Sequence, residues 1–356
     1  MNIDLPALGW NADLAAAYRP FSRSGLQPAR VTRVDRGACA ALSCSGTVRA
    51  SLGATVLDRA ATDPVNLPCA GDWIVVRTWP DDRLTVEAVL PRRTAVVRAS
   101  AEAAASGQVL AANMDAVAVV EAFDPEPDLG RIERLLALAH NSGATPLVIL
   151  TKADLLADPA AVAATVSAAA PSVPVYAVST RTGEGLDRIR PLVRPGRTLG
   201  LLGASGVGKS SLVNALVGAS VMGTRELRTD AKGRHTTTFR ALVPVPGGGA
   251  VLDTPGIRSV GMYEAGPGLA RAFEDIAALA ARCRFVGCAH ESEPGCAVRA
   301  AVESGALARR RLASWRKLTR ELAHELRRRE AREQRVDMYK RRRAERLSHP
   351  RSRRSG

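Results

Sequence analysis

The chain has 356 residues, of which 46% are hydrophobic, so it is long enough for two or three domains with sizeable cores. Its start, MNIDLPALGW, lacks a basic segment followed by an apolar run, and no apolar stretch approaches the roughly 20 residues that a membrane span needs. These features favour a globular, cytoplasmic protein over a membrane protein. Nothing indicates an obligate oligomer, so we expect a monomer.

The formal charge of +15 is concentrated at the C-terminus. Residues 306–356 hold 19 Lys and Arg against 6 Asp and Glu, a net charge of +13, which leaves +2 for the other 305 residues. Such a tail favours a polyanionic partner. RNA is favoured over a membrane surface because the tail has few large apolar or aromatic side chains to insert. The alternative is a solvated helix face.

Residues 29–99, after an N-terminal extension over 1–28, contain five short β-rich segments separated by Gly, Pro and Asp. The segments are RVTRV, GTVRASL, DWIVVRTW, RLTVEAVL and TAVVR. Their number and spacing predict a small β-barrel of the oligonucleotide-binding (OB) type. Trp73 and Trp79 could stack on RNA bases, with core or rim packing as the alternative.

Strands and helices alternate over residues 109–262, after an Ala-rich connector. The strand-like runs are DAVAVVEAF, LVILT, VPVYAVST and TLGLLGAS, and the helical runs are RIERLLALAHNSG, AAVAATVSAAA and LDRIRPLV. Asp128 could cap the first helix and Gly143 could end it. This order predicts a mostly parallel, doubly wound α/β sheet. FRALVPV and AVLDT, separated by PGGG, predict an added antiparallel hairpin.

A phosphate-binding motif follows the last of these parallel strands. GASGVGKS, residues 203–210, fits G-x-x-x-x-G-K-[ST] between an apolar strand and the helical run SLVNALVG. Glycines allow backbone N–H groups to converge on phosphate oxygens, Lys209 can reach the β- and γ-phosphates, and Ser210 can bind Mg²⁺. The motif predicts a nucleoside triphosphate site without specifying the base.

The motif DTPG, residues 253–256, lies about 45 residues further on. Asp253 could hold Mg²⁺ through water while the Gly256 N–H meets the γ-phosphate. This arrangement favours a GTPase over a nucleotide kinase. A simple turn is the alternative.

GRHTTT, residues 233–238, stands where a switch segment would supply a threonine hydroxyl, from Thr236 or Thr237, to Mg²⁺ and the γ-phosphate. Residue 257 is Ile, where many GTPases place a water-orienting Gln. His235 is the nearest polar candidate for orienting the attacking water. The alternative is a switch-stabilising or exposed histidine.

The motif TKAD, residues 151–154, looks like the guanine-reading corner of a GTPase. Asp154 can accept hydrogen bonds from the guanine N1–H and 2-amino group, a donor pair that adenine lacks, while the Lys152 stem can lie along the base. Ser179, at the next strand end, gives a second base-contacting loop. Both base loops precede the phosphate loop, whereas an ordinary GTPase has the phosphate loop first, so we predict a circular permutation. An ordinary strand end and turn is the alternative.

Cys283, Cys288, His290 and Cys296 stand at C-x₄-C-x-H-x₅-C. Three thiolates and one imidazole would complete a closed tetrahedral zinc site with a structural role. Unrelated buried cysteines or a disulfide are the alternatives. The cluster lies in a predicted helical zinc domain over 263–335, and the basic tail over 336–356 is expected to be disordered when free.

These features together resemble the ribosome small subunit-dependent GTPase A family, a bacterial group of circularly permuted GTPases. The resemblance runs from GDW (71–73) through AANMDAVAVV, TKAD, the phosphate loop, GRHTTT and DTPG to CRFVGCAHESEPGCAV. It implies an OB domain, a permuted GTPase domain and a C-terminal zinc domain. It also implies a protein that binds the small ribosomal subunit and acts late in its maturation, with GTP hydrolysis stimulated by that subunit.

The resemblance implies two sets of ligands when it is carried over by position. The zinc set is the Cys₃His group, and the GTP set is Thr151, Lys152, Ala153, Asp154, Gly203, Ala204, Ser205, Gly206, Val207, Gly208, Lys209, Ser210 and Ser211. Thr151 departs from the family's usual Asn, which replaces an amide that can donate and accept with a shorter hydroxyl. The Arg-rich end beyond residue 335 is longer and more basic than the resemblance requires.

We therefore expect an Mg²⁺-dependent GTP hydrolase that docks on ribosomal RNA through the barrel, the zinc domain and the basic tail. Turnover without the ribosome should be slow, because no Gln is in place and a partner can order the switch. Two rivals remain. One is a metabolic P-loop enzyme that phosphorylates a small molecule, and the other is a nucleic-acid-binding protein in which the nucleotide is only structural.

Overall fold

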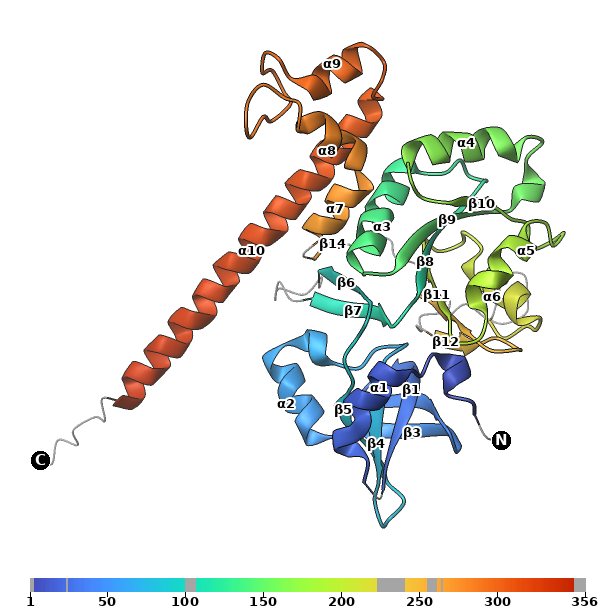
Figure 1. Ribbon diagram of the computed structural model, residues 1–356. Coiled ribbons are helices and arrows are strands. Elements are labelled where there is room, and N and C mark those ends of the chain that lie inside the picture. The colour runs from blue at the N-terminus through green and yellow to red at the C-terminus, as the bar shows by residue number, and fades with distance from the viewer. Residues whose placement is uncertain are drawn as a thin grey trace, which may run out of the picture.

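The computed structural model describes residues 3–23, 25–99, 107–222, 241–254, 261–263 and 265–348. Figure 1 shows a barrel near the N-terminus, a central α/β region and a helical C-terminal region from which one long helix extends away from the rest. The described strands form a closed barrel, a six-stranded sheet and a three-stranded sheet.

Strands β1 to β5 close the barrel in the order β1-β2-β3-β5-β4. Their bounds are β1 Leu26–Asp35, β2 Ala38–Ser43, β3 Gly46–Leu52, β4 Trp73–Thr78 and β5 Leu84–Val89, with helix α2 Ala54–Thr62 and the 3₁₀ turn η3 Pro64–Asn66 between β3 and β4. β3 and β5 pair in parallel, and the other neighbours are antiparallel. The predicted OB-like barrel is therefore present.

Two barrel strands differ from those predicted. Residues 38–43, ACAALS, form β2, although Ala has a low intrinsic preference for strands. The run TAVVR, predicted as a barrel strand, instead contributes to β6, Ala95–Ala99. This strand pairs with β7, Gly107–Ala112, and β14, Gly261–Met262, in the three-stranded sheet. The strand propensity of a segment can predict that it forms a strand, but tertiary packing determines which other strands it pairs with.

The N-terminal extension packs on the barrel. Its elements are the 3₁₀ turns η1 Pro6–Leu8 and η2 Arg19–Phe21 and the helix α1 Ala12–Tyr18, in which Asn11 caps α1 by accepting from the Leu14 N–H. Trp73 is 1% exposed, and its ring centroid lies 5.0 Å from that of Trp10, so the packing alternative holds for this residue. Trp79 is 38% exposed.

The six-stranded sheet has the order β10-β9-β8-β11-β13-β12. Its strands are β8 Ala116–Ala122, β9 Thr145–Thr151, β10 Val175–Ala177, β11 Thr198–Leu202, β12 Ala241–Pro244 and β13 Ala250–Asp253. All neighbours pair in parallel except β12, which runs antiparallel to β13 at the edge. The doubly wound sheet and the added hairpin are both as predicted.

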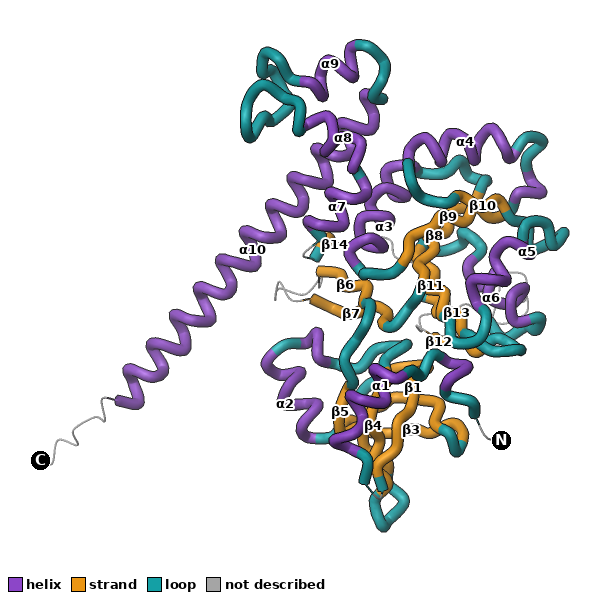
Figure 2. Tube along the Cα trace, viewed as in Figure 1, coloured by secondary structure: helices purple, strands orange, loops and turns teal. Residues whose placement is uncertain are grey.

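Helices cover both faces of this sheet (Figure 2). They are α3 Leu129–Asn141, α4 Pro159–Ala169, α5 Leu186–Ile189 and α6 Lys209–Val217, with the 3₁₀ turns η4 Ala153–Leu155 and η5 Arg190–Val193. Val117 and Val119 of β8 belong to the core that includes α3, whereas Ala118 and Val120 belong to the core of α5 and α6. Successive side chains of a strand point to opposite faces, so this apolar strand is buried on both. Asp128 caps α3 as predicted.

The C-terminal region packs against α3. It consists of α7 Gly266–Ala272, α8 Glu274–Ala280, α9 Ala297–Glu303 and α10 Arg309–Ser348. Phe273, Val298 and Leu312 share one buried core with the residues of α3. Gly268 permits the close approach of α7, because a Cβ there would stand 2.7 Å from the Asn141 Cβ.

Helix α10 corrects the prediction of a disordered tail over residues 336–348, because it continues as far as Ser348, and residues 349–356 lie outside the described ranges. The tail is built mainly from Arg, Glu, Ala, Lys, Leu and Met, which are good helix formers even where no core is available. Net charge had favoured disorder, but it does not measure this local preference. No helix in the described ranges is long and apolar enough to cross a membrane.

Candidate nucleotide site and metal centre

Four of the predicted nucleotide-binding segments follow β9, β10, β11 and β13. These strands are parallel, so their carboxyl ends lie at one edge of the sheet, where α/β proteins bind ligands. Segments far apart in the sequence touch there: the Thr151 hydroxyl contacts the Val207 carbonyl, and the Ser179 hydroxyl contacts the Asp154 carboxylate. The fold thus brings the predicted base and phosphate loops together.

The base loop follows β9 directly. Thr151 is the last residue of the strand and is buried, and Lys152 then takes a left-handed conformation with φ 64°. Ala153 is held by a hydrogen bond from its N–H to the Val178 carbonyl, at 3.1 Å. The Lys152 ammonium donates to the Asp124 carbonyl at 3.1 Å. This turn leaves Lys152 and Asp154 partly exposed beside the phosphate loop.

The Asp154 carboxylate accepts two side-chain hydrogen bonds. The Ser179 hydroxyl donates at 2.5 Å, and the Arg181 Nε donates at 2.8 Å. The hydrogen bond from Ser179, reinforced by Arg181, lowers the pKa of Asp154 below its usual value, so the group is an anion at neutral pH. Ser179 was predicted to belong to a second base-contacting loop, and in the structure its side chain orients Asp154.

The phosphate loop joins β11 to α6. Gly206 and Gly208 have φ of +88° and +91°, a region that glycine enters without steric cost, and Lys209 begins the helix. The buried Lys209 ammonium donates to the carbonyls of Gly203 and Ala204, at 2.9 and 2.8 Å. Ser210 and Ser211 lie in the first turn, whose N–H groups have no partner within the helix and suit an anion.

Asp253 ends β13, beside the strand that leads to the phosphate loop. It accepts a hydrogen bond from Ser210, its Oδ1 has no hydrogen-bond partner among the described residues, and burial raises the pKa of its carboxyl. A buried carboxylate oxygen without a partner beside a serine hydroxyl fits the oxygen donors that Mg²⁺ prefers. Burial lowers the pKa of the neighbouring Lys209, whereas the charges of Asp253 and Glu121 raise it.

The predicted switch and catalytic residues lie outside the described ranges. These are His235, Thr236, Thr237 and Gly256, together with the rest of GRHTTT and the second half of DTPG. Thr254 is described, and its hydroxyl donates to the Leu201 carbonyl at 2.6 Å, which ties the start of the DTPG motif to β11.

Two charged residues of the site were not predicted. Glu121 is buried in β8 near Lys209 and is paired by the guanidinium of Arg131, which donates to Glu121 Oε2 at 2.8 Å. A single acid within the apolar stretch AVAVVEA, residues 116–122, was a usable signal, because buried charges are paired or functional. Arg181 gave no comparable signal, because an arginine in a polar loop is ordinary.

The predicted metal ligands converge. One donor atom from each of Cys283, Cys288, His290 and Cys296 lies within 4.8 Å of the others. The Cys283 and Cys296 sulfurs are 3.9 Å apart, and the His290 Nδ1 lies 3.6 and 3.4 Å from them. A zinc–sulfur bond of about 2.3 Å implies tetrahedral edges of about 3.8 Å, so these residues fit that ion.

The loop between the last two metal ligands is closed by Glu293. Its carboxylate accepts from the backbone N–H groups of Ala289, Glu291 and Ser292, at 2.7 to 3.0 Å. Its own backbone N–H and these donors lower the pKa of Glu293 to about 2. From the other side, Arg316 of α10 donates to the His290 carbonyl, which fixes the metal loop to the long helix.

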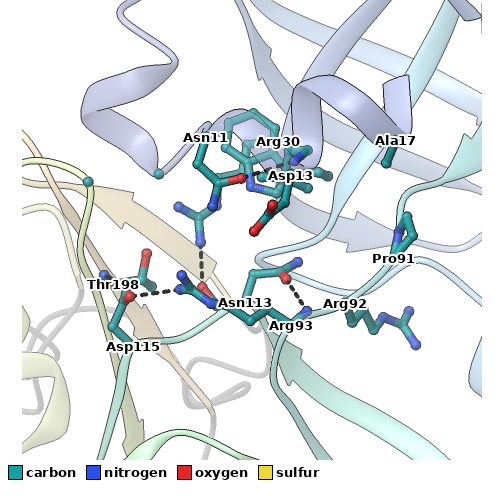
Figure 3. Close-up of a pocket in the computed structure, with 14 residues that line it drawn as sticks. Asn11, Asp13, Ala17, Arg30, Pro91, Arg92, Arg93, Asn113, Asp115 and Thr198 are labelled. Carbon is teal, nitrogen blue, oxygen red and sulfur yellow. Dashed lines mark hydrogen bonds and ion pairs between the residues drawn. The ribbon is translucent and has the colours of Figure 1, made fainter. Parts of the chain in front are cut away.

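A cavity of about 280 Å³ lies at the opposite edge of the sheet, where the N-terminal extension, the barrel and the sheet meet (Figure 3). The buried guanidinium of Arg30 donates to the Leu8 carbonyl and, at 2.9 Å, to the Asn113 carbonyl, and so joins these three parts. Arg93 pairs with Asp115 at 2.7 Å beside it. The cavity therefore belongs to an interdomain joint and is separate from the nucleotide site.

Known proteins match most of the chain. The model of the RsgA GTPase family matches residues 89–263. Small ribosomal subunit biogenesis GTPase RsgA of Streptomyces coelicolor is 50% identical over 321 residues, which cover 89% of this chain and 86% of the relative. The RsgA of Opitutus terrae is 42% identical and covers 91% of both chains.

Two solved structures share the fold. YjeQ from Thermotoga maritima has a TM-score of 0.59 and 24% identity, covering 84% of this chain and 99% of that one. YloQ, titled a circularly permuted GTPase, has a TM-score of 0.56 and 23% identity, covering 85% and 97%. The predicted permuted fold is confirmed. Because the identity to the curated relatives extends over most of both chains, this protein belongs to the RsgA GTPase family of GTP-hydrolysing enzymes.

Proposed function

We propose that this protein binds the small ribosomal subunit late in its maturation, hydrolyses GTP to GDP and phosphate under stimulation by that subunit, and leaves it after hydrolysis. The observation that carries the proposal is the nucleotide site, which four loops build at one edge of the sheet. The relatives that share this chain's sequence are named for biogenesis of the same subunit.

Each loop has an assigned role. Lys152 and Asp154 read guanine, with Ser179 supporting the carboxylate, and residues 203–211 hold the phosphates. Ser210 and Asp253 take Mg²⁺, which supplies charge to the phosphate oxygens when bound. Before any substrate contact, the chain holds Lys209 beside the loop through the Gly203 and Ala204 carbonyls. Two roles stay predictions. One is the switch contact made by Gly256 and by Thr236 or Thr237, and the other is the orientation of the attacking water by His235.

The Cys₃His group holds one structural Zn²⁺ in this proposal. Its donor set leaves no position for a substrate, and its spacing suits the ion. Coordination of the metal would hold the loop from Cys283 to Cys296 against α9 and α10.

Helix α10 and the residues after it are the proposed contacts with ribosomal RNA, together with the barrel and the metal-binding region. Figure 1 shows the far half of α10 standing clear of the other elements. Residues 306–356 carry the net charge of +13, which suits a phosphate backbone. A protein with this partner would work in the cytoplasm, as a monomer.

The test is GTP hydrolysis by the purified full chain, alone and with purified small or large ribosomal subunits. We expect slow turnover alone, strong stimulation by small subunits only, and loss of stimulated turnover in Lys209→Ala. If small subunits left the rate unchanged while the free protein turned over quickly, the ribosome-linked function would be wrong. Phosphate transfer to a small molecule would favour a metabolic enzyme, and RNA binding unaltered by Lys209→Ala would favour a static module.

A further inference from the structure

One oxygen of the Asp154 carboxylate is held by a buried group. Ser179 is fully buried, and its hydroxyl donates to Asp154 Oδ1 at 2.5 Å. The same hydroxyl oxygen accepts from the backbone N–H groups of Arg181 and Thr182, at 3.3 and 3.1 Å. Because this serine is enclosed and bonded to its own loop, its contact with Asp154 is a fixed part of the fold.

The other oxygen of the carboxylate is paired with an exposed side chain. Arg181 follows β10, and its Nε donates to Asp154 Oδ2 at 2.8 Å. The Arg181 side chain is 74% exposed, whereas the Asp154 side chain beneath it is only 10% exposed. An ion pair with so exposed an arginine is weak, because the long side chain loses rotamer freedom and its charge is well solvated. This contact can therefore break and form again easily.

Arg181 offers Asp154 the same kind of donors as guanine does. The guanidinium carries N–H groups on nitrogens that share one carbon, and the N1–H and 2-amino groups of guanine also stand on nitrogens that share one carbon. Recognition of guanine through both carboxylate oxygens requires Oδ2, which is the atom that Arg181 contacts. The exposed arginine lies on the side from which a base can arrive, since Ser179 is buried behind Oδ1.

We propose that Arg181 occupies the guanine-reading carboxylate of Asp154 when no nucleotide is bound, and that guanine displaces it on binding. The inference rests on the proposed GTP-binding function and deepens it. Arg181 then lowers the affinity for every guanine ligand by the fraction of molecules in which the pair is formed, which for an exposed pair is a factor of about three. Selectivity for guanine stays with Asp154.

The test compares Arg181→Ala with Arg188→Ala, which removes the same charge from an exposed position of α5. Equilibrium affinities of the full chain are measured for guanosine, which is uncharged, and for GDP. We expect R181A to bind both ligands about threefold more tightly than the wild type does, because the competition takes place at the base. R188A should leave the affinity for guanosine unchanged.

Salt gives a second measurement that a purely structural role of Arg181 would not change. Raising KCl from about 0.05 to about 0.5 M screens the exposed ion pair between Arg181 and Asp154. The affinity of the wild type for uncharged guanosine should therefore rise with salt toward that of R181A. The affinity of R181A for guanosine should stay constant over the same range.

Each other outcome would overturn the proposal. Weaker guanosine binding by R181A would show that the arginine contacts the bound base. Unchanged guanosine binding, or a wild-type affinity that does not rise with salt, would show that the arginine does not compete with guanine. An equal gain in R188A would assign the effect to net charge.

Thermal unfolding checks that each variant folds, and Arg181→Met, which keeps an unbranched apolar side chain, replaces R181A if that variant does not. The proposed function fails separately. A wild-type chain that bound adenine nucleotides as tightly as guanine nucleotides, or bound neither, would contradict the GTP site itself, and that result is obtained before any variant is made.

Discussion

The carboxylate of Asp154 is the single group on which the predicted base preference depends. Ser179 and Arg181 hold it ionised and oriented in the structure. Guanine offers two donors to such an anion, whereas adenine offers no matching pair. Because hydrogen bonds to a charged group contribute more than neutral ones, the preference should be large and localised at this residue.

We therefore expect Asp154→Asn to lower GTP affinity by roughly 10- to 100-fold, because one of the two donors would face the amide nitrogen. Competition binding of GTP, ATP and XTP measures the change. Arg181→Gln is the matched control, since it alters a neighbour of the same carboxylate and should retain preference for guanine. If D154N discriminated as well as the wild type, TKAD would be only a strand end and a turn.

Glu293 gives a pH-dependent prediction. Its pKa falls from 4.5 to about 2 in the fold, through hydrogen bonds from its own and neighbouring backbone N–H groups. A lowered carboxyl pKa stabilises the fold fully above the unfolded pKa, and this stabilisation is lost as the pH falls toward the folded pKa. The wild type should therefore exceed Glu293→Gln in melting temperature at pH 7, with a difference that shrinks between pH 4.5 and 2. A difference that grew with acidity would contradict this account, and Glu291→Gln is the control.

Between elements, Arg311 joins α10 to the rest of the protein. Its guanidinium is 4% exposed and pairs with Asp275 of α8 at 2.6 Å and with Glu133 of α3 at 3.0 Å. It also donates to the carbonyls of Ala169 and Ala272, at 2.6 and 2.9 Å. One side chain thus connects α10 to four other segments.

Replacing Arg311 with Met should destabilise the protein by about 3 to 5 kcal/mol, because the buried Glu133 carboxylate loses a partner. Urea unfolding measures this loss in the free energy of unfolding. Arg310→Met is the control, because Arg310 pairs with the same Glu133 but is 42% exposed, and it should cost about 1 kcal/mol or less. Equal costs for the two variants would show that burial of Arg311 contributes nothing.

Helices and strands were predicted correctly where the hydrophobic pattern of the sequence fitted only one type of secondary structure. The apolar runs of β8, β9 and β11 and the capped helix α3 fall where the sequence placed them. The prediction failed at β2, where small residues carry no strand signal, and at β6, which pairs with β7 and β14 in a separate three-stranded sheet and not with the barrel strands. Pairing depends on the whole fold, which a local pattern does not contain.

At the scale of the molecule, the metal centre and the sheet share one core. Cys296 and Val298 belong to the same buried cluster as Ile132 of α3 and Leu252 of β13. The predicted nucleotide loops contribute none of the four candidate metal ligands. The metal should therefore stabilise the fold without taking part in nucleotide binding.

Removing the metal with a strong chelator should release one equivalent of zinc, lower the melting temperature and leave GTP affinity within about twofold of its original value. A metal-sensitive dye measures the released zinc, calorimetry measures the melting temperature, and equilibrium binding measures the GTP affinity. Cys44→Ser, at an exposed cysteine outside the centre, controls for thiol chemistry. An unchanged melting temperature after complete release would contradict a structural role.

By itself, the sequence determined the phosphate loop's glycines and lysine and the spacing of the metal ligands, because these depend on residue type at close sequence positions. It also determined the permuted order of motifs, because each motif is local and their order can be followed along the chain. Only the tertiary structure decided which side chains meet across the chain. It paired Thr151 with Val207, Arg131 with Glu121, and Arg311 with Glu133. These contacts join residues 10 to 178 positions apart, and such pairs are fixed by packing of the sheet and helices rather than by any local pattern.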